Sequence, residues 1–247
     1  MEFKNPPPEG INLKANKHKA FTLAEVLITL VIIGIVAAIT VLVIMNQTKW
    51  KQYRSATMKA RSTLDQATIK YAFDNGENPE CGYIFSGSVP TGTKGNDCAA
   101  LYNSFKKSLN VVKICDSNAY SNGCIPDYAG NDTINKANHP NMSDDDAAQA
   151  TAPCGGWNKS RIRNGSAIVL ADGMIIFPYS YFQMPIVAVD VNGQAGPNKW
   201  GHDIHSFLLK VSETNSQPYW DAYYGGCEPI EKGGVSTKIL LYGKNYE

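Results

Sequence analysis

The 247-residue sequence lacks an excess of charge of either sign. Its 23 lysines and arginines almost balance its 22 aspartates and glutamates, and the formal net charge is +1. A chain with this balance has no overall field that gathers nucleic acid or anionic lipid, although local patches can still act. With 43% hydrophobic and 18% charged residues, the chain is not a mostly disordered one. We predict one folded domain with a shorter appendage.

The sequence also lacks the motifs of common active sites. It contains no G-x-S-x-G elbow, no phosphate-binding loop, no dinucleotide fingerprint and no C-x-x-C pair. His202 and His205 flank Asp203, but they lack a Glu-x-x-His context, and a strand would place the two histidines on opposite faces. We interpret both histidines as ordinary surface or loop residues. We therefore predict that the protein is not an enzyme.

One long apolar run is present near the N-terminus. Residues 21–45 read FTLAEVLITLVIIGIVAAITVLVIM, and their only polar members are Thr22, Glu25, Thr29 and Thr40. At about 1.5 Å per helical residue, the run is long enough to cross a hydrocarbon layer of about 30 Å. It is too long for an ordinary secretory signal, and no small-residue cleavage site follows it. We predict a membrane-spanning helix that is retained.

Glu25 needs a partner in this run, because a carboxylate in lipid costs roughly 3 kcal/mol on insertion scales. A cut between Ala20 and Phe21 would create an α-amino group one helical turn from Glu25, or from the Glu25 of a neighbouring copy. Opposite charges attract strongly in a low dielectric. The alternative is that Glu25 simply reaches the headgroup region.

These residues resemble the leader and first helix of type IV prepilins and type II secretion pseudopilins. The resemblance extends over roughly residues 17–43. It implies that a membrane-embedded prepilin peptidase cuts after Ala20 and N-methylates Phe21, and that Glu25 helps to admit each subunit into a growing filament. Two positions differ from the usual pattern, because relatives usually have Gly at the place of Ala20 and often have Pro at the place of Leu42.

The predicted organisation has four parts: a leader (1–20), a transmembrane and assembly helix (21–45), an amphipathic continuation of that helix (46–75) and an extracytoplasmic head (76–247). Apolar residues recur at intervals of three and four from Trp50 to Tyr71, which predicts a helix face that packs on the head. A coiled-coil stalk is the alternative. Asn75-Gly76 and then Pro79 end the helix.

The head divides into two regions by composition. Residues 77–164 predict a loop-rich region with one short helix and few strands, and the acidic run 144–146 reads as a solvated loop or a helix start. Residues 166–242 predict an antiparallel sheet with strands at 167–170, 174–177, 186–191 and 204–211. We predict an α+β, pilin-like fold, in which the long N-terminal helix packs on this sheet in a disulfide-stapled head.

Six cysteines follow the apolar run: Cys81, Cys98, Cys115, Cys124, Cys154 and Cys227. An even number in a Gly- and Asn-rich head predicts disulfides in an oxidising compartment, whereas scattered buried thiols are the alternative. Three lysines precede the span and three basic residues follow it, so charge counting leaves the topology open and the cysteines place the head outside the cytoplasm. Of the fifteen possible pairings, we predict only Cys115 with Cys124, because that loop is short.

The segment from Asp190 to Asp203 concentrates oxygen-bearing side chains with Gly and Pro. It resembles the D-x-N-G-x-x-G-P-N-x-x-G-x-D turn of pilin-like heads, which shapes the loop before the final strand. Calcium is the alternative, with Asp190, Asn192 and Asp203 as ligands, although the spacing is not that of an EF-hand. We expect no other cofactor.

The residues and the resemblance together predict a structural subunit of a pilus-like or pseudopilus-like filament. The expected partners are other pilin-like subunits, a prepilin peptidase, the filament assembly machinery and, before assembly, membrane lipid; no nucleic acid is indicated. The chain would cross the bacterial cytoplasmic membrane once, with its head outside the cytoplasm, and then enter an extracytoplasmic filament. The alternatives are a non-polymerising membrane-anchored binding protein or adhesin and, less favoured, an anchored hydrolase. The type of filament is left open.

Overall fold

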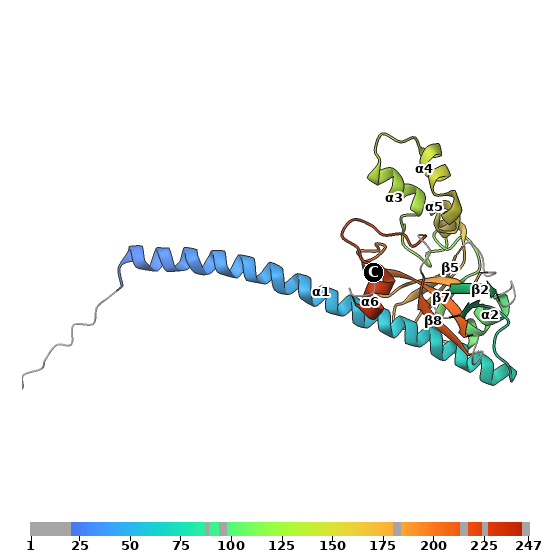
Figure 1. Ribbon diagram of the computed structural model, residues 1–247. Coiled ribbons are helices and arrows are strands. Elements are labelled where there is room, and N and C mark those ends of the chain that lie inside the picture. Colours follow the sequence, from blue (N-terminus) through green and yellow to red (C-terminus); the bar gives the residue numbers. More distant parts are fainter. Residues whose placement is uncertain are drawn as a thin grey trace, which may run out of the picture. The chain divides into compact units, whose positions relative to one another are not determined.

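The computed structural model describes residues 21–86, 89–93, 98–179, 184–212, 217–223 and 227–243 (Figure 1). The chain forms two compact units, Met1–Thr48 and Lys49–Glu247. The predicted leader, with Ala20, lies outside the described residues. The helices of the described part are α1 (Leu23–Asn75), α2 (Ala99–Ser108), α3 (Asn131–Asn138), α4 (Asp144–Ala150), the 3-10 helix η1 (Ala152–Trp157), α5 (Lys159–Asn164) and α6 (Thr237–Tyr242). The strands are β1 (Tyr83–Ser86), β2 (Val89–Thr93), β3 (Val111–Cys115), β4 (Ala167–Leu170), β5 (Ile175–Pro178), β6 (Ile186–Asp190), β7 (Ile204–Ser212) and β8 (Pro218–Ala222).

Helix α1 begins in the first unit and ends in the second. Its apolar segment Leu23–Val41 has 19 residues and a mean hydropathy of 2.6, and its side chains are exposed within the chain. This segment has the length and composition of a membrane span. The helix ends at Asn75, as predicted, and Gly76 follows with φ +74°. Glycine adopts this left-handed conformation readily, which suits it to the residue after a helix.

The strands form one sheet in the order β2-β1-β7-β6-β5-β4-β3, and β8 pairs with β7. Each described strand pair is antiparallel except β1 with β7, so the predicted antiparallel sheet contains one parallel pair. The predicted β4–β5 hairpin is confirmed. β8 pairs with residues 207–211 of β7, and some of these residues also pair with β6 whereas others also pair with β1. Because a strand has two edges, β6 and β1 share one edge of β7 and β8 takes the other.

The prediction for residues 77–164 was wrong in two respects. The region contains α2, α3, α4 and α5 rather than one short helix, and it supplies β1, β2 and β3 to the sheet that we placed in 166–242. The acidic run is a helix start, because the Ser143 hydroxyl caps α4 by accepting a hydrogen bond from the N–H of Asp146 at 3.1 Å. These elements are short, so their sequences carry little of the periodicity that identifies a helix or strand.

The central strands of the sheet are buried on both faces. On one face, Val187 and Val189 of β6 join a core with Leu64 of α1 and Phe105 of α2. On the other face, Ile186 and its alternate neighbours join a core made largely by the segment between β3 and β4 and by the turn before β7. All five residues of β6 are buried. The predicted cover by α1 is confirmed, but the second covering layer was not predicted.

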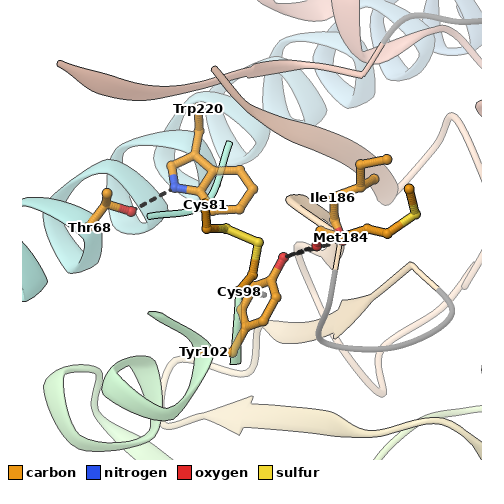
Figure 2. The surroundings of a disulfide bond; sticks show 7 residues. All are labelled: Thr68, Cys81, Cys98, Tyr102, Met184, Ile186 and Trp220. Atoms are coloured by element: carbon orange, nitrogen blue, oxygen red, sulfur yellow. Dashed lines mark hydrogen bonds between the residues drawn. A yellow bond between two sulfur atoms is a disulfide. The ribbon is translucent and has the colours of Figure 1, made fainter. Parts of the chain in front are cut away.

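Two hydrogen bonds attach α1 to β8 in the second unit. The indole N–H of Trp220 donates to the Thr68 hydroxyl at 2.9 Å, and the backbone N–H of Trp220 donates to Asp65 Oδ1 at 2.8 Å. Figure 2 shows the first of these bonds with the Cys81–Cys98 disulfide, whose two cysteines belong to the same core. Trp220 and Thr68 are almost fully buried, so this contact positions the helix on the sheet.

Helices α3 and α4 pack on each other and on η1, and Figure 1 shows them grouped beside α5. The Cys154–Cys227 disulfide joins this group to the segment after β8. The backbone N–H of Lys159 donates to Asp132 Oδ1 at 2.9 Å, and Lys159 Nζ lies 2.9 Å from Asp127. These contacts attach the helical group to the head close to η1 and α5.

Candidate functional site

The start of α1 forms a capping box. Thr22 precedes the first helical residue, and its hydroxyl accepts a hydrogen bond from the N–H of Glu25 at 3.3 Å. In return, Glu25 Oε2 accepts hydrogen bonds from the N–H of Thr22 at 2.8 Å and from its hydroxyl at 2.9 Å. This reciprocal arrangement satisfies donors that the first helical turn leaves without an intrahelical partner. It also holds the Glu25 carboxylate beside the helix start.

Glu25 is the only charged residue in Leu23–Val41. Both Phe21 and Glu25 are exposed, with 84% of the surface of Phe21 accessible. The peptide bond between Ala20 and Phe21 is at the boundary of the described residues, and the predicted pairing of a Phe21 amine with Glu25 stays a prediction. The geometry shows that the two candidate residues are exposed on the same helix start.

All six cysteines form disulfides. The structure pairs Cys115 with Cys124, as predicted, and adds the pairs Cys81–Cys98 and Cys154–Cys227. The sequence separations of these pairs are 9, 17 and 73 residues, in that order. Only the shortest loop had a basis in the sequence, because longer closures depend on which elements meet in the fold.

Asp190 organises the turn between β6 and β7. Its Oδ1 accepts hydrogen bonds from the N–H groups of Asn192 at 3.1 Å and Gly193 at 2.7 Å, and its Oδ2 accepts one from the Tyr128 hydroxyl at 2.7 Å. Burial raises the pKa of the Asp190 carboxyl to about 7, although the Tyr128 hydroxyl opposes this shift. Gly193 has φ +62°, and a Cβ there would lie 2.0 Å from the carbonyl oxygen of Gly173. The turn therefore requires glycine at 193.

Asp203 closes the same turn from its other end. Its Oδ2 accepts a hydrogen bond from the N–H of Asn198 at 2.8 Å, and its Oδ1 accepts one from the N–H of Lys199 at 2.7 Å. Asp190 and Asp203 are both fully buried. All four of their carboxylate oxygens thus accept hydrogen bonds from protein donors, which supports the turn interpretation.

Calcium binding at Asp190, Asn192 and Asp203 stays a prediction. A calcium ion would have to replace the N–H and O–H donors whose hydrogen bonds these carboxylates now accept. Within the ranges that the structure describes, no three His, Cys, Asp or Glu side chains are placed to hold a metal ion. The measurement is the thermal stability of the chain with and without calcium, compared with that of Asp203→Asn.

The interpretation of His205 as a surface or loop residue was wrong. His205 is fully buried in β7, and its Nε2 lies 3.0 Å from the carbonyl oxygen of His202. Because a carbonyl accepts, Nε2 carries the proton and Nδ1 is the bare nitrogen, which has no hydrogen-bond partner among the described residues. Burial lowers the pKa of His205 to about 4, so the ring is neutral at pH 7. No catalytic arrangement surrounds it in the described part of the chain.

Two residues of the candidate sites, Thr22 and Tyr128, were not predicted from the sequence. Thr22 had a local signal, because Thr-x-x-Glu before an apolar run is the pattern of a capping box. Tyr128 had none, because 62 residues separate it from Asp190 and only the fold brings their side chains together.

Comparison with known proteins identifies the N-terminal segment. Residues 15–41 match the family model of the prokaryotic N-terminal methylation motif, which is the prepilin-type cleavage and methylation motif. No curated protein and no solved structure matches the chain. The matched segment contains Ala20, Phe21, Thr22 and Glu25. The motif supports a precursor of the prepilin and pseudopilin type, and it implies processing by a prepilin peptidase and assembly with other pilin-like subunits.

Proposed function

We propose that this protein is a structural subunit of a type IV pilus-like or type II secretion pseudopilus-like filament. The observation that supports this most directly is the methylation motif, whose apolar helix contains a single charged residue, Glu25. A prepilin peptidase cuts after Ala20 and methylates the new amine of Phe21. The mature helix then exchanges contacts with lipid for contacts with neighbouring helices.

Glu25 acts in assembly through its charge. Its Oε2 is occupied by Thr22, whereas its Oε1 accepts no hydrogen bond from the described residues. An amine on Phe21, from the same subunit or from a neighbour, would be a partner of opposite charge in a medium of low dielectric. Removing one member of such a pair leaves the other charge unpaired, which costs more than the pair contributes.

The proposed location follows from the apolar helix and the cysteines. Before assembly, Leu23–Val41 would cross the bacterial cytoplasmic membrane, and the disulfide-containing head would lie on the oxidising side. The proposed partners are the peptidase and the assembly machinery in that membrane, and other pilin-like subunits through the N-terminal helix. After assembly, the head would be part of an extracytoplasmic filament.

The test is Glu25→Ala in cells that contain the matching peptidase and assembly machinery. Because the span stays apolar, we expect this variant to insert into the membrane. We expect the amount of the variant in sheared filaments to fall at least tenfold below that of the wild type. Thr40→Ala is the matched control, since the Thr40 hydroxyl donates only to carbonyl groups of its own helix turn, at 2.9 and 3.1 Å. A normal filament yield from Glu25→Ala would refute the assembly role.

The mass of the mature N-terminus separates this proposal from its alternative. A chain that begins at N-methylated Phe21 supports the filament subunit. A chain that still begins at Met1 contradicts processing and favours a membrane-anchored binding protein or adhesin that does not polymerise.

A further inference from the structure

Three basic residues follow the apolar part of α1 directly. Lys49, Lys51 and Arg54 are exposed, and Lys49 comes four residues after the end of the apolar run at 45. Four residues of helix correspond to about 6 Å along the axis. In a helix that crosses the membrane, this distance places Lys49 in the layer of lipid headgroups, and Arg54, about 14 Å beyond the run, reaches that layer through its long side chain.

The three cations have no counter-charge of their own. None of them forms an ion pair with a residue that the structure describes, and the sequence contains no acidic residue between Glu25 and Asp65. Three positive charges without an ion pair therefore lie within residues 49–54, next to the span, although the chain as a whole is almost neutral.

The next three cations along α1 differ in this respect. Each one faces a carboxylate: Lys59 with Asp172 at 2.7 Å, Arg61 with Asp65 at 3.7 Å, and Lys70 with Asp74 at 2.8 Å. The contrast between the two sets follows their distance from the apolar segment. It indicates that the partner of the first set is something that lies next to the span and not on the head.

Aromatic residues at the same level fit such a partner. Trp50 and Tyr53 are half-buried, so each presents part of an amphipathic ring at the helix surface. Tryptophan and tyrosine are enriched where a helix leaves the hydrocarbon and enters the headgroup layer. The apolar run is thus followed along α1 by basic residues interleaved with aromatic ones, a composition that suits the interface between hydrocarbon and headgroups.

We propose that Lys49, Lys51 and Arg54 form a binding surface for the anionic headgroups of phospholipids on the side of the membrane that faces the head. This inference rests on the proposed function, because it requires the span to lie in a membrane before assembly. Each cation close to an anionic surface strengthens binding roughly fivefold, so three together contribute roughly a hundredfold. The surface retains the stored subunit at the membrane, and extraction of the helix into a filament must release these headgroups.

The experiment measures lipid binding to the mature chain, residues 21–247, by native mass spectrometry in detergent. The probes are phosphatidylglycerol and phosphatidylcholine with identical acyl chains. We expect the wild type to bind phosphatidylglycerol at least tenfold more tightly, and the preference to weaken between about 0.05 and about 0.5 M salt, the range in which screening becomes short-ranged. The triple variant Lys49→Gln, Lys51→Gln, Arg54→Gln should lose the preference. The matched control removes the same charge from the same helix by combining Lys59→Gln, Arg61→Gln and Lys70→Gln.

Two results overturn the proposal. Equal binding of the two lipids by the wild type does so, and so does an equal loss in both triple variants, because overall charge and not these three positions would then explain the effect. A third result also contradicts the proposal: the wild type shows no lipid preference, and the triple variant at Lys49, Lys51 and Arg54 fails to form filaments. The three cations would then bind a neighbouring subunit instead of lipid. Retention of the wild type in lipid nanodiscs is measured in parallel. A chain that leaves the nanodisc refutes the membrane anchor and with it the proposed function, whereas a chain that stays without a lipid preference refutes only the headgroup surface.

Discussion

Replacing Thr68 with valine removes the hydroxyl that accepts the hydrogen bond of the Trp220 indole N–H. The substitution therefore weakens the contact between α1 and β8. The two residues are 1% and 0% exposed, and the donor and acceptor lie 2.9 Å apart. Valine has nearly the shape of threonine and a similar helix propensity. It also removes the bond that the Thr68 hydroxyl donates to the Leu64 carbonyl at 2.9 Å, but that carbonyl is a helix acceptor, so the main effect is a buried indole N–H without a partner. Such a group costs roughly 2 kcal/mol, which is the expected loss in the free energy of unfolding.

A double-mutant cycle isolates this bond from the loss of packing. In a Trp220→Phe background the indole N–H is absent, so Thr68→Val should cost only a few tenths of a kcal/mol, and the coupling energy should be about 1.5 kcal/mol. The assay is guanidinium unfolding of the mature chain in detergent, followed by near-ultraviolet circular dichroism. Thr40→Val is the control, because the Thr40 hydroxyl donates only within its own helix. Equal costs of Thr68→Val in both backgrounds would show that the bond from the Trp220 indole to the Thr68 hydroxyl does not stabilise the fold.

The remaining predictions concern the disulfides and one buried titratable group. Replacing Cys154 and Cys227 together with alanine should destabilise the head by roughly 2 kcal/mol more than replacing Cys115 and Cys124, because loops of 73 and 9 residues differ in closure entropy by about that amount; thermal unfolding of the two double variants measures this, and the reverse order contradicts it. His205 has a folded pKa of about 4 against about 6.5 in an unfolded chain, so the unfolded state binds more protons in that window and stability falls as pH drops from about 6.5 to 4. His205→Gln should remove roughly 2 kcal/mol of this loss, measured as the difference in unfolding free energy between about pH 7 and pH 4.5; an unchanged pH dependence would show that His205 is not its source.

Several elements were predictable because their signals are local. The apolar run and its single glutamate are contiguous, and α1 ends at Asn75 before Gly76 as the residue types indicate. The β4–β5 hairpin has two short apolar runs on either side of an Asp-Gly turn, a pattern that is sufficient on its own. The Cys115–Cys124 pair closes a loop so short that few other partners compete.

The predictions that were wrong concern features that depend on contacts between distant parts of the chain. β1, β2 and β3 are strands of four or five residues. β1 and β3 become strands because β7 and β4 offer them free edges, and β2 then pairs with β1. The neutral His205 is buried because the sheet is covered on both faces, and one layer of that cover comes from a region with little periodicity. Neither the free edges nor the second cover can be seen in a short window of sequence.

The candidate sites also differ in whether their residues are close together or far apart in the sequence. Thr22 and Glu25 are three residues apart, so the sequence alone contains the capping box that the structure shows. The hydrogen bond between Tyr128 and Asp190 joins residues that are 62 positions apart, and it exists only after β6 and the segment that covers it have met.

Local residue patterns account for the methylation motif, the apolar helix and the place where that helix ends, because hydrophobic length, capping and helix termination depend on neighbouring residues. The Cys81–Cys98 and Cys154–Cys227 pairs, the parallel pairing of β1 with β7 and the burial of the central strands on both faces arise from long-range packing. These features join residues that are far apart in the chain, and their free energy comes from packing and from excluding water, which no local pattern records.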